Sequence, residues 1–245
     1  MKNSLNKSQI ERFSRQLVLK DIGPKGQKKI LSSKILIVGV GGLGCPAAES
    51  LVRAGVGTIG LMDNDIVSLS NIHRQSLFNS KDIKKPKVSV AAKKLKEINP
   101  LTKIKTYKSR LNEKNIENII KNYELIIDGS DNFKTKFLIN DYCIKFKKKL
   151  ITGAISKFDG HIFTFDFKDK KTASLKNFYQ EKEISDDILN CEFEGVLGTT
   201  ASIVGATQAN EALKMILGVG KNLKNQILII DLLNLNFRKV KFKKR

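Results

Sequence analysis

The sequence predicts an α/β fold, in which a doubly wound and mainly parallel sheet is extended by antiparallel strands in the C-terminal half. Three observations carry this prediction. Short apolar runs rich in β-branched residues alternate with helix-compatible segments through the first half of the chain. A glycine-rich turn follows the first of these runs. Beyond residue 160 the residues alternate as they do in antiparallel strands.

The first predicted strand covers 34–39, where a run of Ile, Leu and Val ends in glycine. A helix is expected at 45–54, with Pro46 in its first turn, where the missing N–H of proline costs little. The second strand is expected at 58–63. The helix predicted at 86–98 begins at a proline and is stopped by the Asn-Pro pair that follows it.

The same alternation continues to the middle of the chain. We expect, in order, a strand at 103–107, a helix at 115–121, a strand at 125–128, a helix from 133 and a strand at 150–152. Strands and helices that alternate at these lengths favour a doubly wound sheet.

The second half has a different pattern. An antiparallel strand is predicted at 161–167, and a helix with many small residues at 198–217, which would allow it to pack closely on the sheet. Two further strands are expected at 227–231 and 237–242. Residues 168–194 are polar and without a sustained period, so we expect a functional crossover loop or a disordered segment there. No internal repeat is visible, and residues 1–245 are expected to form a single domain.

The composition indicates a globular protein with a basic surface. The chain of 245 residues has 45 Lys and Arg against 24 Asp and Glu, a net charge of +21, yet 41% of its residues are hydrophobic, which argues against disorder. The lysines are spread along amphipathic segments, so most of the charge is expected on a solvated surface that would favour an acidic partner. No apolar run reaches the ~20 residues of a membrane span. The N-terminus lacks the apolar core of a secretory signal, so we expect a cytoplasmic protein without a membrane partner.

The basic C-terminus is interpreted as a strand. Val240 and Phe242 alternate with lysines after Arg238, and this alternation predicts a final half-buried strand better than a flexible arm for nucleic acid. We therefore expect no nucleic-acid partner.

Three cysteines, Cys45, Cys143 and Cys191, form no closely spaced pair. This argues against a disulfide framework and excludes a four-cysteine zinc site within this chain. Cys45 and Cys143 fall on predicted helices and are expected to be packing residues.

A phosphate-binding turn is predicted between the first strand and the first helix. Gly39, Gly41, Gly42 and Gly44 stand there, and such glycines allow backbone N–H groups at a helix N-terminus to approach phosphate. Asp63 ends the next strand, where a carboxylate can accept hydrogen bonds from a ribose. The pattern indicates a Rossmann-like nucleotide site rather than a turn without a ligand. It does not by itself distinguish NAD from ATP.

Charged residues after the neighbouring strands favour phosphate chemistry. Arg74 and Lys87 supply two cations, Asn71 a polar donor and Asp131 a carboxylate, all expected near one phosphate cluster. A dinucleotide dehydrogenase does not need this set, whereas phosphoryl or nucleotidyl transfer does, because charge develops on the phosphates and a metal ion must be held.

Several short motifs occur in order along the chain: Arg12-Phe-Ser-Arg15-Gln, Gly39-Val-Gly-Gly-Leu-Gly44, Ala54-Gly-Val-Gly57, Asp63-Asn-Asp65, Ser68-Leu-Ser-Asn-Ile-His-Arg-Gln75, Pro86-Lys87-Val88, Ile98-Asn-Pro100 and Ser130-Asp-Asn132. With these motifs the chain resembles the MoeB/ThiF/HesA sulfur-carrier adenylyltransferases, bacterial relatives of the ubiquitin-activating enzymes. The resemblance covers nearly the whole chain.

The resemblance implies a function. Such enzymes use ATP and Mg²⁺ to adenylylate the C-terminal Gly-Gly carboxylate of a small ubiquitin-like sulfur-carrier protein, releasing pyrophosphate and preparing the carrier for thiocarboxylate formation. Thiamine and molybdopterin biosynthesis both use this reaction, with a slight preference here for thiamine. The nucleotide-binding part would span about 33–155, and the carrier-binding and crossover part about 156–245.

The resemblance also implies roles for individual residues. Gly42 would lie against the nucleotide and Asp63 would hold the ribose, while Asp131 would hold Mg²⁺. Arg15 resembles an arginine that reaches the ATP site of a partner protomer, so a homodimer is expected; a cation on the helix surface is the alternative. The remaining nucleotide contacts would come from Ser70, Asn71, Arg74, Lys87 and Asn132.

The chain departs from the family pattern at zinc. Family members usually carry two Cys-x-x-Cys pairs, but this chain has Ala173 and Lys176 in place of the first and no second pair, so zinc is expected to be absent. Cys191 aligns with the cysteine of the family's crossover loop, which in some members forms a covalent sulfur link with the carrier. Two interpretations of Cys191 are open: it handles sulfur together with a sulfurtransferase partner, or it is an inert thiol of the loop.

Three other functions remain open. A tRNA threonylcarbamoyladenosine dehydratase-like enzyme would suit the basic charge, but that group typically lacks the Arg-x-x-Arg-Gln and Ser-Leu-Ser-Asn motifs present here. A NAD-binding oxidoreductase and a non-catalytic nucleotide-binding module are both compatible with the glycine turn and Asp63.

Overall fold

Eight strands form one sheet in the order β3-β2-β1-β4-β5-β6-β7-β8 in the computed structural model, which describes residues 4–179 and 195–244. The pairs from β3 to β5 are parallel, and the pairs from β5 to β8 are antiparallel. The predicted fold class is therefore confirmed. The strands are β1 (Lys34–Val38), β2 (Thr58–Met62), β3 (Lys103–Tyr107), β4 (Leu125–Asp128), β5 (Lys149–Ser156), β6 (Asp159–Asp166), β7 (Gln226–Asp231) and β8 (Asn236–Lys241).

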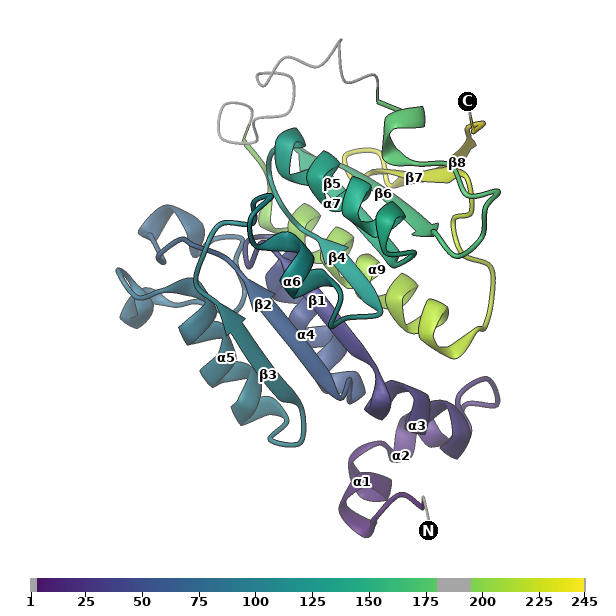
Figure 1. Ribbon diagram of the computed structural model, residues 1–245. Helices are drawn as coiled ribbons and strands as arrows, with labels where there is room; N and C mark the ends of the chain where they lie inside the picture. The colour runs from purple at the N-terminus through teal and green to yellow at the C-terminus, as the bar shows by residue number, and fades with distance from the viewer. Residues whose placement is uncertain (1–3, 180–194, 245) are drawn as a thin grey trace.

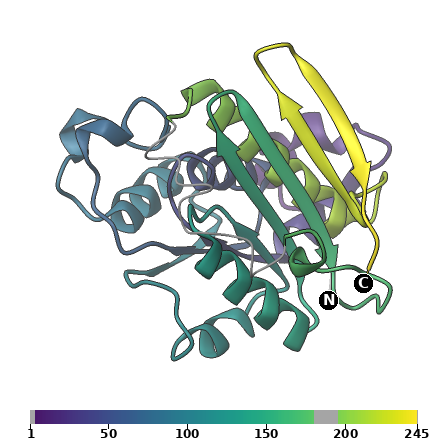
Figure 2. The ribbon, with the colours of Figure 1, turned by 90° about the horizontal axis from the view of Figure 1, so that it is seen from above.

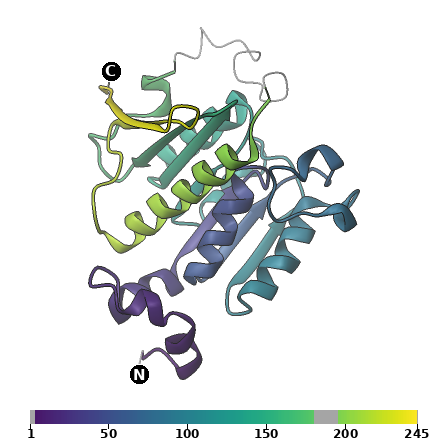
Figure 3. The same cartoon turned by 180° about the vertical axis from the view of Figure 1, so that it is seen from behind.

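Helices cover the two faces of the sheet (Figures 1 and 3). One face carries α4 (Gly44–Ala54), α5 (Lys87–Ile98) and α9 (Gly198–Leu217), with α4 between the other two and packed against both. The other face carries α6 (Ile116–Ile120) and α7 (Phe133–Lys145), which packs on β4 and β5. Short 3₁₀ turns lie at η1 (Leu69–Asn71), η2 (Ser80–Asp82) and η3 (Leu175–Asn177).

The central strands are buried on both faces. In β1, Ile35 and Ile37 belong to the apolar cluster on the α4, α5 and α9 side, whereas Leu36 and Val38 belong to the cluster on the α6 and α7 side. Successive side chains of a strand point to opposite faces, so a strand between two helical layers must be apolar throughout. This explains the uninterrupted apolar run at 34–39.

Three helices precede the first strand, where we assigned no element from the sequence: α1 (Lys7–Arg12), α2 (Ser14–Leu17) and α3 (Gly23–Ser32). Two of them are short, with six residues in α1 and four in α2. Phe13, only 1% exposed, anchors this segment by packing its ring on Gly55. The contact is so close that a Cβ added to Gly55 would lie 2.5 Å from the Phe13 Cζ. The segment is thus held by a contact between residues distant in the sequence.

The C-terminal half corrects two expectations. The β7 and β8 strands form a hairpin at the edge of the sheet (Figure 2), and all six residues of β8 are exposed, so the expected half-buried strand is wrong for Val240. It holds for Phe242, which follows β8 and is half-buried against the rings of Phe163 and Phe178. The first part of the predicted irregular segment, 168–179, is packed: Leu175 is 1% exposed, and the rings of Phe178 and Tyr179 contact Phe163. Residues 180–194 lie outside the described residues.

Within the described residues, the structure has no helix with both the length and the apolar character needed to cross a membrane.

Candidate functional site

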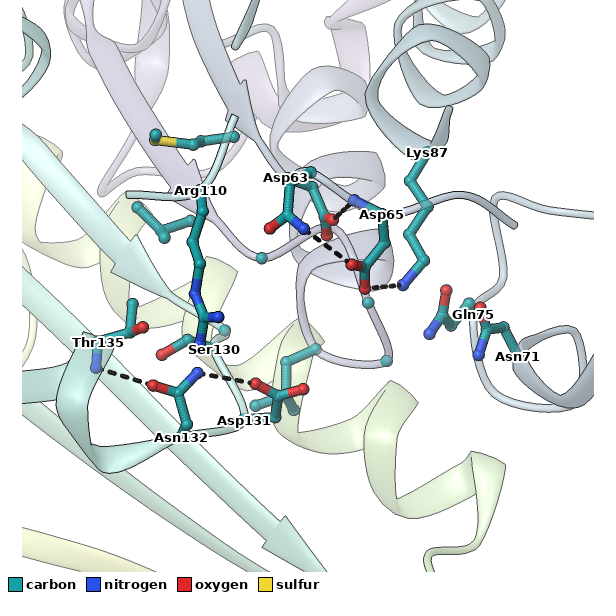
Figure 4. A pocket seen from close by; sticks show the side chains of 18 of the residues that line it. Asp63, Asp65, Asn71, Gln75, Lys87, Arg110, Ser130, Asp131, Asn132 and Thr135 are labelled. Atoms are coloured by element: carbon teal, nitrogen blue, oxygen red, sulfur yellow. Dashed lines mark hydrogen bonds and ion pairs between the residues drawn. The ribbon is translucent and has the colours of Figure 1, made fainter. Parts of the chain in front are cut away.

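A cavity of about 570 Å³ lies at the carboxyl ends of β1, β2 and β4 (Figure 4). The chain runs outward from β1 to β2 and β3, then returns to β4 on the other side of β1. At such a switch point, the loops after neighbouring parallel strands diverge and open a crevice, which is where ligands bind in doubly wound sheets. The volume lies within the ~300–1,000 Å³ range of small-molecule sites.

The glycine turn after β1 forms one wall of the cavity. Gly39 has a φ of +86°, and its N–H donates to the Met62 carbonyl at 2.8 Å. A Cβ on Gly44 would lie 1.9 Å from the Gly39 carbonyl oxygen, so the start of α4 is pressed onto the turn. Both positions require glycine. The tight turn predicted between the first strand and the first helix is therefore present.

Two other glycines of the turn keep the wall open. A Cβ on Gly41 would meet only the Gln75 amide nitrogen, at 3.6 Å, and would otherwise enter the cavity. A Cβ on Gly42 would lie 3.2 Å from the Ala201 Cβ and 3.7 Å from the Arg74 Cγ. The backbone here can therefore come close to a ligand, as a phosphate-binding turn requires.

Asp63 links the end of β2 to this turn. Its carboxylate accepts hydrogen bonds from the N–H groups of Val40 and Asp65, both at 2.8 Å. Burial raises the pKa of Asp63 and outweighs these two hydrogen bonds and the charge of Lys87, which act in the opposite direction. The carboxylate oxygens retain lone pairs that can accept from a ribose hydroxyl.

Two cations face the cavity from the segments after β2. The Lys87 ammonium, on a side chain only 7% exposed, forms an ion pair of 3.0 Å with Asp65, whose side chain is 56% exposed. The Arg74 Nη1 donates to the Ser70 carbonyl at 2.8 Å and lies 2.9 Å from the His73 ring Nε2. Both cations line the same cavity, as the sequence predicted.

The amide of Asn71 is also oriented by the local fold. Its Oδ1 accepts from the Ser68 N–H at 3.2 Å, which closes the η1 turn. Asn71 and Ser70 both line the cavity.

The opposite wall comes from the loop between β4 and α7. Asn132 caps α7, since its Oδ1 accepts from the Thr135 N–H at 2.9 Å, and its Nδ2 donates to Asp131 at 3.0 Å (Figure 4). Asp131 is exposed at the cavity wall. Carboxylate and amide oxygens are the ligands that Mg²⁺ prefers, so this loop has the chemistry for that ion.

Most of the predicted site residues therefore meet in one place. Those that line the cavity are Gly39, Gly41, Gly42, Asp63, Ser70, Asn71, Arg74, Lys87, Asp131 and Asn132. Gly44 lies behind the turn as a packing residue. Cys191 lies outside the described residues.

Arg15 lies away from the cavity of its own chain. It is on α2, next to Phe13, which contacts Gly55 at the C-terminal end of α4. The glycine turn is at the other end of that helix, which has 11 residues and is therefore about 16 Å long. Arg15 is not among the residues that line the cavity.

Sequence reasoning gave no role to several residues of the cavity wall, among them Arg110, Gln75 and Lys136. Arg110 comes from the irregular loop after β3 and projects toward Ser130 and Asn132 (Figure 4). Gln75 is 3% exposed, and its Oε1 has no hydrogen-bond partner among the described residues. Lys136 is 5% exposed on α7. Two of these residues had a signal in the sequence: Gln75 ends the motif that begins at Ser68, and Lys136 is a lysine between the apolar residues of a predicted helix.

The region expected to lack zinc is held by ordinary contacts. Ala173 is fully buried, and its N–H donates to Asn225 at 2.8 Å. Lys176 forms an ion pair of 2.9 Å with Asp141. Residues 4–179 and 195–244 contain no group of three or more His, Cys, Asp or Glu side chains placed to hold a metal ion.

The two described cysteines are packing residues. Cys45 and Cys143 are completely buried, and burial raises the pKa of Cys45 to about 12 and that of Cys143 well above its usual value. Neither thiol would be nucleophilic at neutral pH.

Comparison with known proteins gives matches along the whole chain. The model of the ThiF family matches residues 13–245. The sulfur carrier protein adenylyltransferase of Thermus thermophilus is 37% identical over 237 residues, which cover 96% of this chain and 88% of that protein. A probable molybdopterin-synthase adenylyltransferase of Gracilaria tenuistipitata is 40% identical, over 98% of this chain and 66% of its own length. The probable adenylyltransferase/sulfurtransferase MoeZ of Mycobacterium tuberculosis is 34% identical, and this chain spans 62% of it.

Solved structures share the fold at lower identity. The Escherichia coli protein MccB, determined with ATP, has a TM-score of 0.82 and 20% identity, over 96% of this chain and 72% of that one. PaaA has a TM-score of 0.82 and 21% identity, over 99% of this chain and 76% of its own.

Proposed function

The chain belongs to the ThiF family, and from this membership and its site we propose that it is an ATP-dependent adenylyltransferase. Its substrate would be the C-terminal Gly-Gly carboxylate of a small ubiquitin-like sulfur-carrier protein. Relatives that cover most of the chain are named as adenylyltransferases, one of them of a sulfur carrier protein.

One observation carries the proposal: Arg74, Lys87 and Asp131 line the same cavity as the open glycine turn. Two cations and a carboxylate beside a phosphate-binding turn suit a reaction in which negative charge moves between phosphate oxygens. A nicotinamide-dependent oxidoreductase would gain nothing from this set. Intact cationic positions also argue against a non-catalytic module.

The residues fit ATP and Mg²⁺. The turn at Gly41 and Gly42 leaves room for a phosphate against the backbone, and Asp63 would accept from the ribose. Asp131, supported by Asn132, would hold the magnesium ion, which when bound neutralises phosphate charge and orients the leaving group. The phosphates would be held by Ser70, Asn71, Arg74 and Lys87.

In the proposed reaction, a carboxylate oxygen of the carrier attacks the α-phosphorus of ATP. The bond from the α-phosphorus to the bridging oxygen breaks, and the electron pair leaves with pyrophosphate. The product is an acyl-adenylate, a mixed anhydride that a sulfur nucleophile can attack. Arg74 and Lys87 would stabilise the charge on the phosphates during this step, because they act from fixed positions in a partly enclosed site.

We assign Arg15 to the site of a partner protomer in a homodimer. It lies on a short helix and does not line the cavity of its own chain, so a role in an ATP site would have to be played across an interface. The nucleotide-binding part, about 33–155, would then combine with a carrier-binding part, about 156–245, within one domain.

Cys191 is the candidate for sulfur chemistry after adenylylation. Names such as adenylyltransferase and sulfurtransferase MOCS3, from Drosophila virilis, show that the two activities occur together in longer relatives. This chain spans 53% of that protein. A sulfurtransferase is the further partner that we propose for the adenylylated carrier. Mass spectrometry of the carrier complex formed by the protein and by its Cys191→Ser variant tests whether a covalent link forms at this thiol.

Pyrophosphate exchange tests the proposed function. Purified protein should exchange labelled pyrophosphate into ATP only when a Gly-Gly-ended carrier of the thiamine or molybdopterin type is present. A carrier that lacks the two glycines is the matched control. Absence of exchange with every carrier of its own cell, or binding of a nicotinamide cofactor without affinity for ATP, would reject the proposal; ATP-dependent modification of tRNA would favour the dehydratase alternative.

A further inference from the structure

A buried network lies beneath the cavity and is centred on Asp128, the last residue of β4. Asp128 is fully buried. One carboxylate oxygen accepts from the backbone N–H of Ser130 at 2.9 Å and from its hydroxyl, and the other accepts from the Thr152 hydroxyl and from the Lys136 ammonium, at 3.2 Å. Its carbonyl oxygen accepts from Gln208 of α9 at 2.9 Å.

Lys136 completes this network from α7. Its side chain is 6% exposed, and its ammonium also donates to the Gly153 carbonyl on β5, at 2.7 Å. A charge this deeply buried is tolerated only where partners compensate its lost hydration, and here one carboxylate and one carbonyl do so. Lys136 therefore ties α7 to the end of β4 and to the middle of β5.

The loop that carries Asp131 is enclosed by these bonds. It begins at Asp128, where Ser130 is held by the carboxylate, and it ends at Asn132, the cap of α7. Lys136 stands in the second turn of that helix and returns to Asp128. Asp131 is itself exposed, so its position depends on the two ends of the loop that this ion pair fixes.

We propose that Lys136 and Asp128 are positioning residues that hold Asp131 in place for the magnesium ion bound with ATP. The inference rests on the proposed function. Partners beyond the direct ligands typically change metal affinity by about 10- to 100-fold when removed, because a misplaced ligand binds its metal poorly.

The test measures the Mg²⁺ concentration that half-saturates binding of a non-hydrolysable ATP analogue, by calorimetry. The Lys136→Met variant keeps the length of the side chain and removes its charge. We expect this variant to need at least about tenfold more Mg²⁺ for half-saturation. Its affinity for the analogue in the absence of Mg²⁺ should change less. The Lys136→Arg variant keeps the charge and should recover most of the Mg²⁺ affinity.

Lys148→Met is the matched control. Lys148 is partly buried just before β5, at the amino end of that strand, and its ammonium donates to the Tyr123 and Lys121 carbonyls at 2.6 and 3.0 Å. Like that of Lys136, its ammonium donates to main-chain carbonyls, but none of its contacts among the described residues is to Asp128 or to the Asp131 loop. Its removal should leave the Mg²⁺ requirement unchanged even where it lowers thermal stability.

The outcomes separate the two proposals. If the unaltered protein binds no ATP analogue at any Mg²⁺ concentration, the proposed function fails. If it binds normally and folded Lys136→Met shows the same Mg²⁺ requirement, or Lys148→Met shifts it equally, the positioning role is wrong. Should Lys136→Met not fold, Thr152→Val removes one hydrogen bond from the same carboxylate oxygen without altering charge, and an unchanged Mg²⁺ requirement in that variant would reject the role.

Discussion

Lys87 shows at the scale of a single residue how the site is prepared for an anion. Its side chain is almost completely buried, but its carboxylate partner, Asp65, is mostly exposed. An exposed carboxylate can rotate away at small cost, because water replaces the lost contact. A phosphate entering the cavity can therefore take the place of Asp65 beside an ammonium that stays where it is.

This arrangement gives a first prediction. Lys87→Met should lower the carrier-dependent pyrophosphate exchange rate by about 100-fold or more, as removal of one charge-stabilising donor does in other active sites. Lys93→Met is the control, since Lys93 is an exposed lysine of the same helix. Equal activity in both variants would remove Lys87 from the proposed phosphate site.

At the scale of elements, the strand–turn–helix unit of β1 and α4 separates two kinds of glycine. Gly44 is required by packing, because a side chain there would collide with the backbone of Gly39. No packing contact requires glycine at position 41, because a Cβ there would enter the cavity. The distinction predicts opposite effects of the same substitution.

Gly44→Ala should therefore lower the free energy of unfolding by about 2 kcal/mol or more, because the added methyl group would collide with the Gly39 backbone. Gly41→Ala should change it by less than about 0.5 kcal/mol, yet weaken ATP binding by about tenfold, which corresponds to about 1.4 kcal/mol. Urea unfolding and calorimetric titration measure the two quantities. A strongly destabilised Gly41→Ala protein would contradict this division.

A second element-scale prediction concerns β6. Burial lowers the pKa of His161, with the nearby Arg238 acting in the same direction and Asp159 in the opposite one. In the unfolded chain the imidazole binds a proton as the pH falls through about 6.5, whereas in the folded chain it stays neutral to a lower pH. The unfolded state then holds more protons, so stability falls as the pH decreases below about 6.5.

The His161→Gln variant should lose this part of the pH dependence. Urea unfolding at about pH 7.5 and about pH 5.5 compares the two proteins. The loss of stability between the two pH values should be smaller in His161→Gln than in the unaltered protein. An equal loss would show that His161 titrates alike in the folded and unfolded chains.

At the scale of the whole molecule, the site lies at one edge of the sheet and the N-terminal helices at the other. Arg15 is not among the residues that line the cavity of its own chain, so the role that we propose for it requires a partner protomer. The net charge of +21 is carried by a lysine-rich chain, and at long range it would attract an acidic carrier and be weakened by salt.

Mixing two inactive variants tests the shared site. Arg15→Ala and Lys87→Met should each be inactive alone, because one lacks the donated arginine and the other the resident lysine. After unfolding and joint refolding, roughly a quarter of the unaltered activity should return, because half of the randomly paired dimers carry one complete site. No recovery, despite mixed dimers seen by native mass spectrometry, would place Arg15 outside the active site.

Much of this molecule is determined by local sequence. The buried strand at 34–39, the glycine turn and the helix after Pro86 are each signalled by neighbouring residues, because an unbroken apolar run, a cluster of glycines and a proline at a helix start can each be seen within a few residues. For the same reason, most predicted ligands of the nucleotide meet in one cavity: parallel strands end at a common edge of the sheet, so the residues after them gather there.

The tertiary structure alone decided the rest. The short helices before β1 are held by the packing of Phe13 on Gly55. Lys136 of α7 forms its contacts with Asp128 of β4 and Gly153 of β5, which are separate elements. The exposure of β8 follows from its place at the edge of the sheet, which its alternating sequence does not reveal. In each case the deciding contact joins residues far apart in the chain or depends on which strands become neighbours, and the energy of such a contact is absent from any local pattern.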